Sequence, residues 1–229
     1  MALSPRPWVA LVALVALVAL PGPSVASKRQ LCRVSRGDRA ALARGEPPEL
    51  GAVTVTNGEP WGQWGFPQFC PPGAFASGFR LKVQPHQGFF RDDTGLNGVQ
   101  LICDNSTDTV TSSVGLYGSW ESPVLCPQGE FLTSFRLRVE PSVGIRDDTA
   151  ATDMEATCAG GLVLQGKGLP WGEWGAWSRS CGSSCRICGI RTRVDPHHFF
   201  DTKGLTDLRL YCCPHGGYGW GQPGTPRTP

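Results

Sequence analysis

One pattern of residues occurs three times along this chain of 229 residues. Each copy begins with an aromatic-glycine motif and a cysteine. It continues with an alternating apolar segment that ends at proline, an acidic segment and a second cysteine. In all three copies the first cysteine precedes the central apolar residue (Phe79, Phe135 or Ile190) by 9 residues, and the first aspartate precedes the last cysteine by 11. Two spacings kept across three copies indicate three related structural units.

The alternating segments predict antiparallel β-strands with one buried and one polar face. The residues of the expected buried face are Phe75, Ser77, Phe79, Leu81 and Val83 in the first copy and Phe131, Thr133, Phe135, Leu137 and Val139 in the second. A second strand is expected at Val99, Leu101 and Cys103, matched by Met154, Ala156 and Cys158 and by Leu208, Leu210 and Cys212.

Shorter strands complete each copy. One precedes each aromatic motif, at residues 53–56, 110–114 and 162–165, and the stretch between tryptophan and cysteine adds another. No stretch has helical periodicity, so we predict an all-β fold of three four-stranded antiparallel sheets around a pseudo-threefold axis. A cationic face should then point to solvent: Arg80, Lys82, Arg136, Arg138, Arg191 and Arg193. Its simplest role is to keep the sheets soluble, and its alternative role is to bind glycans or polyanions.

The two ends of the chain lack this pattern. Residues 1–26 carry one positive charge, an apolar run of 13 residues and small residues before Ser27, which predicts a secretory signal peptide. Residues 27–50 are expected to form a basic flexible leader, and residues 214–229 a disordered tail rich in Gly and Pro. The domain should span residues 51–213, with repeats at about 51–104, 105–160 and 161–213.

Composition narrows the classes of function. The net charge is only +2, which gives no support to nucleic-acid binding. Ten cysteines suggest an oxidising compartment, hence a secreted protein in the extracellular space. After residue 26 no apolar run reaches 18 residues, so no membrane span is expected. No phosphate-loop, dinucleotide or nucleophile-elbow motif is present, and we expect no cofactor.

The acidic segments hold the candidate catalytic residues, Asp92, Asp147 and Asp201, one per repeat at the same place. Paired carboxylates are what glycoside chemistry requires. Their recurrence in every copy favours a structural role instead, in which they hydrogen-bond their own loop backbone. No metal site is expected, because His197 and His198 have no second histidine-rich segment to join. Asn105-Ser106-Thr107 is an acceptor triplet for N-glycosylation.

The repeated tryptophans allow two interpretations. Aromatic rings can stack on sugars, but periodic tryptophans in a sheet protein more often pack inside it. We therefore expect Trp64, Trp120 and Trp174 to be buried.

A midpoint argument predicts the disulfides. If the two long strands of a repeat form a hairpin, cysteines equidistant from its turn face each other. The midpoints fall next to the strand-ending proline in all three copies, so each repeat should close on itself through Cys70–Cys103, Cys126–Cys158 and Cys181–Cys212. Cys188–Cys213 and Cys32–Cys185 would use the remaining four cysteines. In the third repeat the partners could be exchanged, as Cys181–Cys213 and Cys188–Cys212.

The joint pattern resembles the vitelline membrane outer layer protein 1 family. The features that carry it are the triple Trp-Gly-x-Trp or Gly-Ser-Trp motif, the Phe-x-Leu-x-Val strands, Asp-Asp-Thr and the adjacent cysteines near the end, over roughly residues 53–213. The resemblance implies a secreted β-prism of three Greek-key sheets. The sequence departs from the pattern at Asp201-Thr202-Lys203 and where Asn97 becomes Thr152 and Thr206. Cys32 and Cys185 are also additional.

The resemblance implies a structural or interaction protein of an extracellular coat or fluid layer, with extracellular glycans or glycoproteins as partners. Two alternatives are carbohydrate-active: a β-prism lectin, and a lysozyme-like transferase acting on N-acetylglucosamine oligomers. No position offers a nucleophile, a base and an orienting group together, so the sequence favours binding over catalysis.

Overall fold

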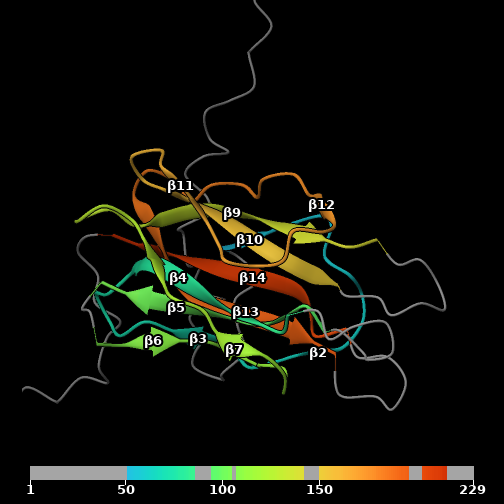
Figure 1. The fold of residues 1–229 in the computed structure, drawn as a ribbon. Coiled ribbons are helices and arrows are strands. Elements are labelled where there is room, and N and C mark those ends of the chain that lie inside the picture. Colours follow the sequence, from blue (N-terminus) through green and yellow to red (C-terminus); the bar gives the residue numbers. More distant parts are fainter. Residues whose placement is uncertain (1–50, 86–93, 105–106, 142–149, 196–202, 216–229) are drawn as a thin grey trace, which may run out of the picture.

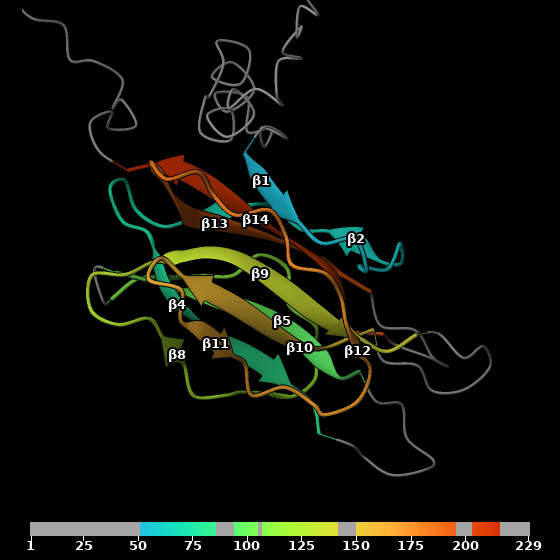
Figure 2. The same cartoon turned by 90° about the horizontal axis from the view of Figure 1, so that it is seen from above.

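The computed structural model describes residues 51–85, 94–104, 107–141, 150–195 and 203–215 (Figure 1). They form three antiparallel sheets, which together enclose one core (Figure 2). Sheet A contains β1 (Ala52–Thr54), β14 (Leu205–Pro214), β13 (Cys185–Val194) and β2 (Gln63–Trp64), in that order, with β3 (Gln68–Phe69) also paired to β13. Sheet B contains β6 (Thr109–Val110), β5 (Leu96–Cys103), β4 (Ala76–Val83) and β7 (Ser119–Trp120), with β8 (Val124–Leu125) also paired to β4. Sheet C contains β11 (Val163–Gln165), β10 (Ala151–Cys158), β9 (Leu132–Val139) and β12 (Glu173–Trp174).

Each sheet is assembled from two successive repeats. The long hairpin of one repeat receives the aromatic-motif strand of the next, so Trp120 pairs with Lys82 and Trp174 with Arg138. The last hairpin, β13–β14, receives the first strands of the chain, and Trp64 pairs with Arg193. The predicted all-β prism is confirmed, but its sheets do not coincide with the sequence repeats.

The inner faces of the three sheets supply the core. Phe79, Phe135 and Ile190, which are equivalent in the repeats, are all fully buried. The second long strands contribute in the same way, and Leu101, Met154 and Leu208 have no exposed surface. Inward-facing residues of three sheets therefore meet, as the alternation predicted.

A bulge shifts the alternation at the start of each hairpin. The register of β4 against β5 moves between Ala76 and Gly78, which leaves Ser77 as an extra residue. Thr133 holds the same position in β9. Both side chains turn away from the core and donate hydrogen bonds to carbonyls of the neighbouring strand, those of Ile102 and Thr157. The expectation that Ser77 and Thr133 belong to the buried face is therefore wrong.

Four disulfides lie among the described residues: Cys70–Cys103, Cys126–Cys158, Cys181–Cys212 and Cys188–Cys213. The hairpin geometry used to derive the first three is wrong, because Cys103 lies opposite Ala76 and not opposite Cys70. Cys70 instead follows β3, and its amide donates to Cys188 O of sheet A. Cys70–Cys103 therefore joins sheet A to sheet B.

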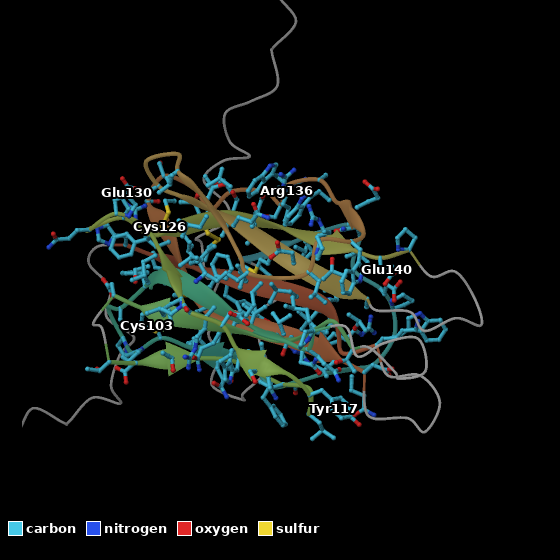
Figure 3. The ribbon with its side chains drawn as sticks, viewed as in Figure 1. Cys103, Tyr117, Cys126, Glu130, Arg136 and Glu140 are labelled. Atoms are coloured by element: carbon cyan, nitrogen blue, oxygen red, sulfur yellow. A yellow bond between two sulfur atoms is a disulfide. The ribbon has the colours of Figure 1, made fainter. Side chains whose placement is uncertain are left out.

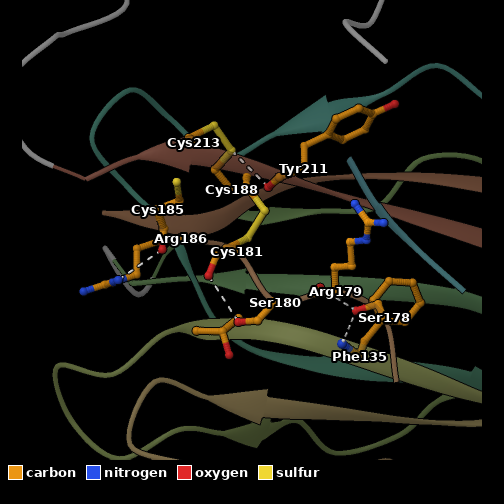
Figure 4. Close-up of a disulfide and its surroundings, with 12 residues drawn as sticks. Phe135, Ser178, Arg179, Ser180, Cys181, Cys185, Arg186, Cys188, Tyr211 and Cys213 are labelled. Carbon is orange, nitrogen blue, oxygen red and sulfur yellow. Dashed lines mark hydrogen bonds between the residues drawn. A yellow bond between two sulfur atoms is a disulfide. The ribbon is translucent and has the colours of Figure 1, made fainter. Parts of the chain in front are cut away.

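The other two repeat-equivalent disulfides also join one sheet to the next. Cys126–Cys158 joins sheet B to sheet C, and Cys181–Cys212 joins sheet C to sheet A, which closes a ring of covalent links between sheets. Cys188 occupies the bulge position of β13 and links to Cys213 on the paired strand of the same sheet (Figure 4). Cys32 lies outside the described residues, so its pairing with Cys185 stays a prediction.

Candidate functional site

The candidate aspartates Asp92, Asp147 and Asp201 lie outside the described residues, as do His197, His198 and Asn105. The structure does describe the residues on either side of the three acidic segments, which we call the stems of these segments. The first long strands are followed directly by Gln84, Glu140 and Asp195, whose amides donate to the carbonyls of Gly95, Ala150 and Gly204 at 2.9, 2.9 and 2.8 Å. Glu140 lies at this end of the prism and Glu130 at the other (Figure 3).

The three stems touch one another. The amide of Ala150, just before β10 of sheet C, donates to the carbonyl of Lys203, just before β14 of sheet A, at 3.4 Å. Gly204 lies so close to sheet B that an added Cβ would approach Thr94 O to 2.4 Å. The acidic segments therefore start from a shared base at one end of the prism.

Polar side chains where the acidic segments begin form hydrogen bonds to the facing side of the same hairpin. Gln84 Oε1 accepts hydrogen bonds from the Thr94 amide at 3.2 Å and its hydroxyl at 2.5 Å. Asp195 Oδ2 accepts from the Lys203 amide at 3.4 Å in the equivalent place. These residues fix the stems, which is the structural role expected for a feature that occurs in every repeat.

The departures at Thr152 and Thr206 have a structural explanation. Each threonine hydroxyl donates to the carbonyl of the aromatic residue that opens the motif, Trp171 at 2.7 Å and Trp61 at 2.6 Å. In the first repeat Asn97 instead donates to Thr94 Oγ1 at 2.5 Å. The departures therefore change how the motif is held in place.

The expectation that the motif tryptophans are buried is wrong. Trp64, Trp120 and Trp174 are half-buried and lie on the outer faces of the sheets. The register explains this, because each lies directly opposite a cationic residue of an outer face. Guanidinium groups cover the rings: Arg80 is 5.3 Å from the centroid of Trp120, and Arg136 and Arg138 are 4.9 and 4.6 Å from that of Trp174.

On the outer face of sheet C, one arginine contacts two tryptophan rings and also forms an ion pair. Arg136 also lies 4.9 Å from the centroid of Trp177, which is 38% exposed. The Nε and Nη2 atoms of Arg136 both lie 2.7 Å from Glu155 Oε2. Figure 3 shows Arg136 on the outside of this sheet. The outer faces are thus built from alternating cations and aromatic rings, a surface suited to polar and anionic partners.

Two carboxylates with a raised pKa were missed from the sequence, the buried Asp153 on β10 and the half-buried Asp207 on β14. Burial raises the pKa of Asp153, although hydrogen bonds from the amides of Met154 and Gly168 and from the Gln165 side chain lower it. Burial raises the pKa of Asp207 as well, against the lowering effect of the Leu208 amide. The dipeptide Thr-Asp at the same place in the second and third repeats was the available signal.

These two carboxylates belong to different sheets, and each binds the backbone of its own strand. They supply no acid and base facing one substrate. Within the described ranges, no group of three or more His, Cys, Asp or Glu side chains could hold a metal ion. No helix in that same part of the chain is long and apolar enough to cross a membrane.

Comparison with known structures gives remote likenesses. A prostate-specific WGA16 glycoprotein lectin matches with a TM-score of 0.47 and 14% identity, over 71% of this chain and 99% of that chain. The agglutinin of Calystegia sepium matches with a TM-score of 0.45 and 13% identity, over 71% of this chain and 95% of that chain.

Sequence relatives are much closer. The vitelline membrane outer layer protein 1 homolog of Mus musculus is 43% identical over 174 residues, which is 73% of this chain and 86% of the relative. The homolog of Homo sapiens is 42% identical over 183 residues, which is 77% of this chain and 90% of the relative. The family described as Vitelline membrane outer layer protein I matches residues 51–215, which include all three sheets. The chain therefore belongs to the vitelline membrane outer layer protein I family.

Proposed function

We propose that this protein is a secreted structural and interaction component of an extracellular coat or fluid layer. The observation that carries the proposal is the ring of three disulfides that joins each sheet to the next. Such links persist in oxidising compartments and stabilise a domain that must survive outside the cell. The names of the relatives refer to the outer layer of the vitelline membrane, which agrees with this role.

The outer faces support a role in binding. Their rings and guanidinium groups face outward and are partly exposed, so they can meet a partner without a change of fold. Trp61 and Trp177 are 55% and 38% exposed and add aromatic surface. Glycans and glycoproteins offer the apolar sugar faces, hydroxyls and anionic groups that such surfaces accept.

We further propose that Asn105 carries an N-linked glycan. It lies in the connection between β5 and β6, which the hydrogen bond from the Cys103 amide to Asp108 O closes at 3.0 Å. The flanking residues Asp104 and Thr107 are exposed, which suits glycan attachment.

Secretion, binding and catalysis can be tested on one preparation. The full chain is expressed in mammalian cells, and the protein in the medium is treated with a glycosidase that removes N-linked glycans. It is then incubated with an insoluble extracellular coat fraction and sedimented. In parallel, it is incubated with N-acetylglucosamine oligomers. We expect secretion, a mass shift with the glycosidase that is absent in Asn105→Gln, cosedimentation, and no change in the oligomers.

Two results would contradict the proposal. Protein that stays in the supernatant under all conditions would exclude a coat component. Turnover of the oligomers that is lost in Asp147→Asn, at unchanged stability, would support the transferase alternative instead. Asp92→Asn and Asp201→Asn extend this second test to the other repeats, and a glycan array distinguishes the lectin alternative.

A further inference from the structure

The outer face of sheet A differs from those of sheets B and C at one pair of positions. Arg80, Arg136 and Arg191 are equivalent, each one residue after the central buried residue of its repeat. Their cross-strand neighbours are Gln100 in sheet B, Glu155 in sheet C and Arg209 in sheet A. The same site therefore holds an arginine beside a neutral glutamine, an ion pair and a like-charged pair.

The first two pairs show what this arginine binds. Arg80 Nε donates to Gln100 Oε1 at 2.6 Å. Arg136 donates to Glu155 Oε2 through Nε and Nη2. In sheet A the partner is another guanidinium, and Arg191 Nε donates to Gly65 O at 2.8 Å instead. Like charges directly opposite each other destabilise a sheet, so this pair costs stability in the absence of a counter-ion.

Three cations converge at this place. The guanidinium carbons of Arg191, Arg193 and Arg209 lie 5.5, 5.5 and 4.5 Å from the centroid of Trp64. The acidic residue among the cross-strand partners on this face is Asp207, opposite Arg193, and the backbone carbonyl of Glu59 accepts a hydrogen bond from Arg193 Nη1 at 3.4 Å. Sheet C has the equivalent Asp153 together with Glu155, so Asp207 does not restore the missing charge. All three arginines and the tryptophan are partly exposed.

We propose that Arg191, Arg209 and Trp64 on the outer face of sheet A bind a sulfate group of a sulfated glycan. Two adjacent guanidinium groups match the oxygens of a tetrahedral anion, which supplies the negative charge that Glu155 supplies in sheet C. The part of the Trp64 ring that these guanidinium groups leave exposed can contact the attached sugar. The proposal names the chemistry of one partner and rests on the proposed secreted location, where sulfated glycans occur. Figure 2 shows the outer face of sheet A turned away from the other two sheets.

The test compares charge changes on and off this face in the full secreted chain. Arg209→Glu recreates the ion pair of sheet C, and Arg209→Gln recreates the arginine–glutamine pair of sheet B. Arg179→Glu is the matched control, because Arg179 is exposed and follows β12 of sheet C. Calorimetry measures binding to a heparin hexasaccharide, to the same hexasaccharide after desulfation and to free sodium sulfate.

We expect Arg209→Glu to weaken hexasaccharide binding by about tenfold or more, the loss expected for a charge-assisted contact, and Arg179→Glu to change it less than about twofold. Without ligand, Arg209→Glu should raise the melting temperature, since the like-charged pair becomes an ion pair. Should Arg209→Glu fail to fold, Arg209→Gln supplies the comparison, because glutamine already lies beside this arginine in sheet B.

Three outcomes overturn the proposal. Equal weakening by Arg209→Glu and Arg179→Glu would mean that net charge or the basic leader accounts for binding. Undiminished binding of the desulfated hexasaccharide would show that sulfate is not recognised. Binding of free sulfate as tight as that of the hexasaccharide would mean an ion site rather than a glycan site. Each result is independent of secretion and of cosedimentation with a coat, so failure here leaves the proposed function standing.

Discussion

At the scale of single residues, the glycine of the aromatic motif is the residue with least freedom to change. Gly62, Gly118 and Gly172 have φ of +82°, +77° and +87°, a region that residues with a side chain rarely adopt. An added Cβ would lie within 2.6 Å of the carbonyl oxygen that ends the central strand of the sheet that the motif joins. This close approach explains why an aromatic-glycine dipeptide occurs in every copy.

The steric effect of an added Cβ on stability can be separated from the effect of the positive φ. Gly129 has φ of +81°, almost the same as Gly118, but an added Cβ there meets nothing within 4 Å. We expect Gly129→Ala to lower the free energy of unfolding by about 1 kcal/mol and Gly118→Ala by at least about 3 kcal/mol. Urea denaturation with the disulfides intact measures both, and equal losses would contradict the steric explanation.

Asp153 makes stability depend on pH. Its pKa is raised in the folded state, chiefly by burial, so the folded protein holds this proton more tightly than the unfolded chain does. The stabilisation is complete below the unfolded pKa of 3.8 and is lost as the pH rises through the folded pKa. The difference in unfolding free energy between the wild type and Asp153→Asn should therefore fall as the pH increases. Denaturation curves between about pH 3 and pH 7 test this, and a rising difference would reverse the sign assigned here.

At the scale of strands, sequence periodicity predicts the elements well and their partners poorly. The alternation in β4 and β9 depends on residues within one strand, so Phe79, Leu81 and Val83 could be assigned to the core in advance. The bulge at Ser77 depends on the opposite strand, and so does the outward position of Trp120. Of the candidate site, the recurring acidic segments were visible in the sequence, whereas the contrast between Glu155 and Arg209 became apparent only from the cross-strand register.

The first strand offers a test of its place in the fold. Val53 of β1 is 1% exposed and lies opposite Leu210, while Thr54 lies on the exposed face. We expect Val53→Ala to cost about 2 kcal/mol through the cavity it leaves and Thr54→Ala to stay within about 0.5 kcal/mol. Chemical denaturation of both variants provides the comparison. A small effect at Val53 would mean that β1 is dispensable for the core.

At the scale of the molecule, the fold is a ring of three similar parts with one connection missing. In sheet C five residues connect Thr157 of β10 to its partner Val163 of β11. The equivalent partners in sheet A are Tyr211 of β14 and Ala52 of β1, which lie near the two ends of the described chain. Their strands are joined by hydrogen bonds, including Cys212 N to Gly51 O at 2.8 Å.

A circular permutant should therefore keep the fold. A linker of about four residues would join residue 215 to residue 51, and the new ends would lie between the exposed residues Gln128 and Gly129. The reference is residues 51–215 in the natural order, with Cys185→Ser in both proteins because Cys32 is absent from both. We expect the same four disulfides by peptide mapping and melting temperatures within about 5 °C. Scrambled disulfides in the permutant alone would show that the order of the strands matters.

The strands of sheet A are synthesised at widely separated times. Sheets B and C each come from one continuous stretch of chain, whereas β1, β2 and β3 are made first and their partners β13 and β14 last. Translation of the 115 residues between Phe69 and Cys185 takes on the order of ten seconds, during which these three strands have no sheet to join. The disulfide Cys70–Cys103 can form within that interval and hold β1, β2 and β3 beside sheet B before β13 and β14 are made. A ribosome that stops before β13 would therefore release a chain that is tethered but still open at its first strands.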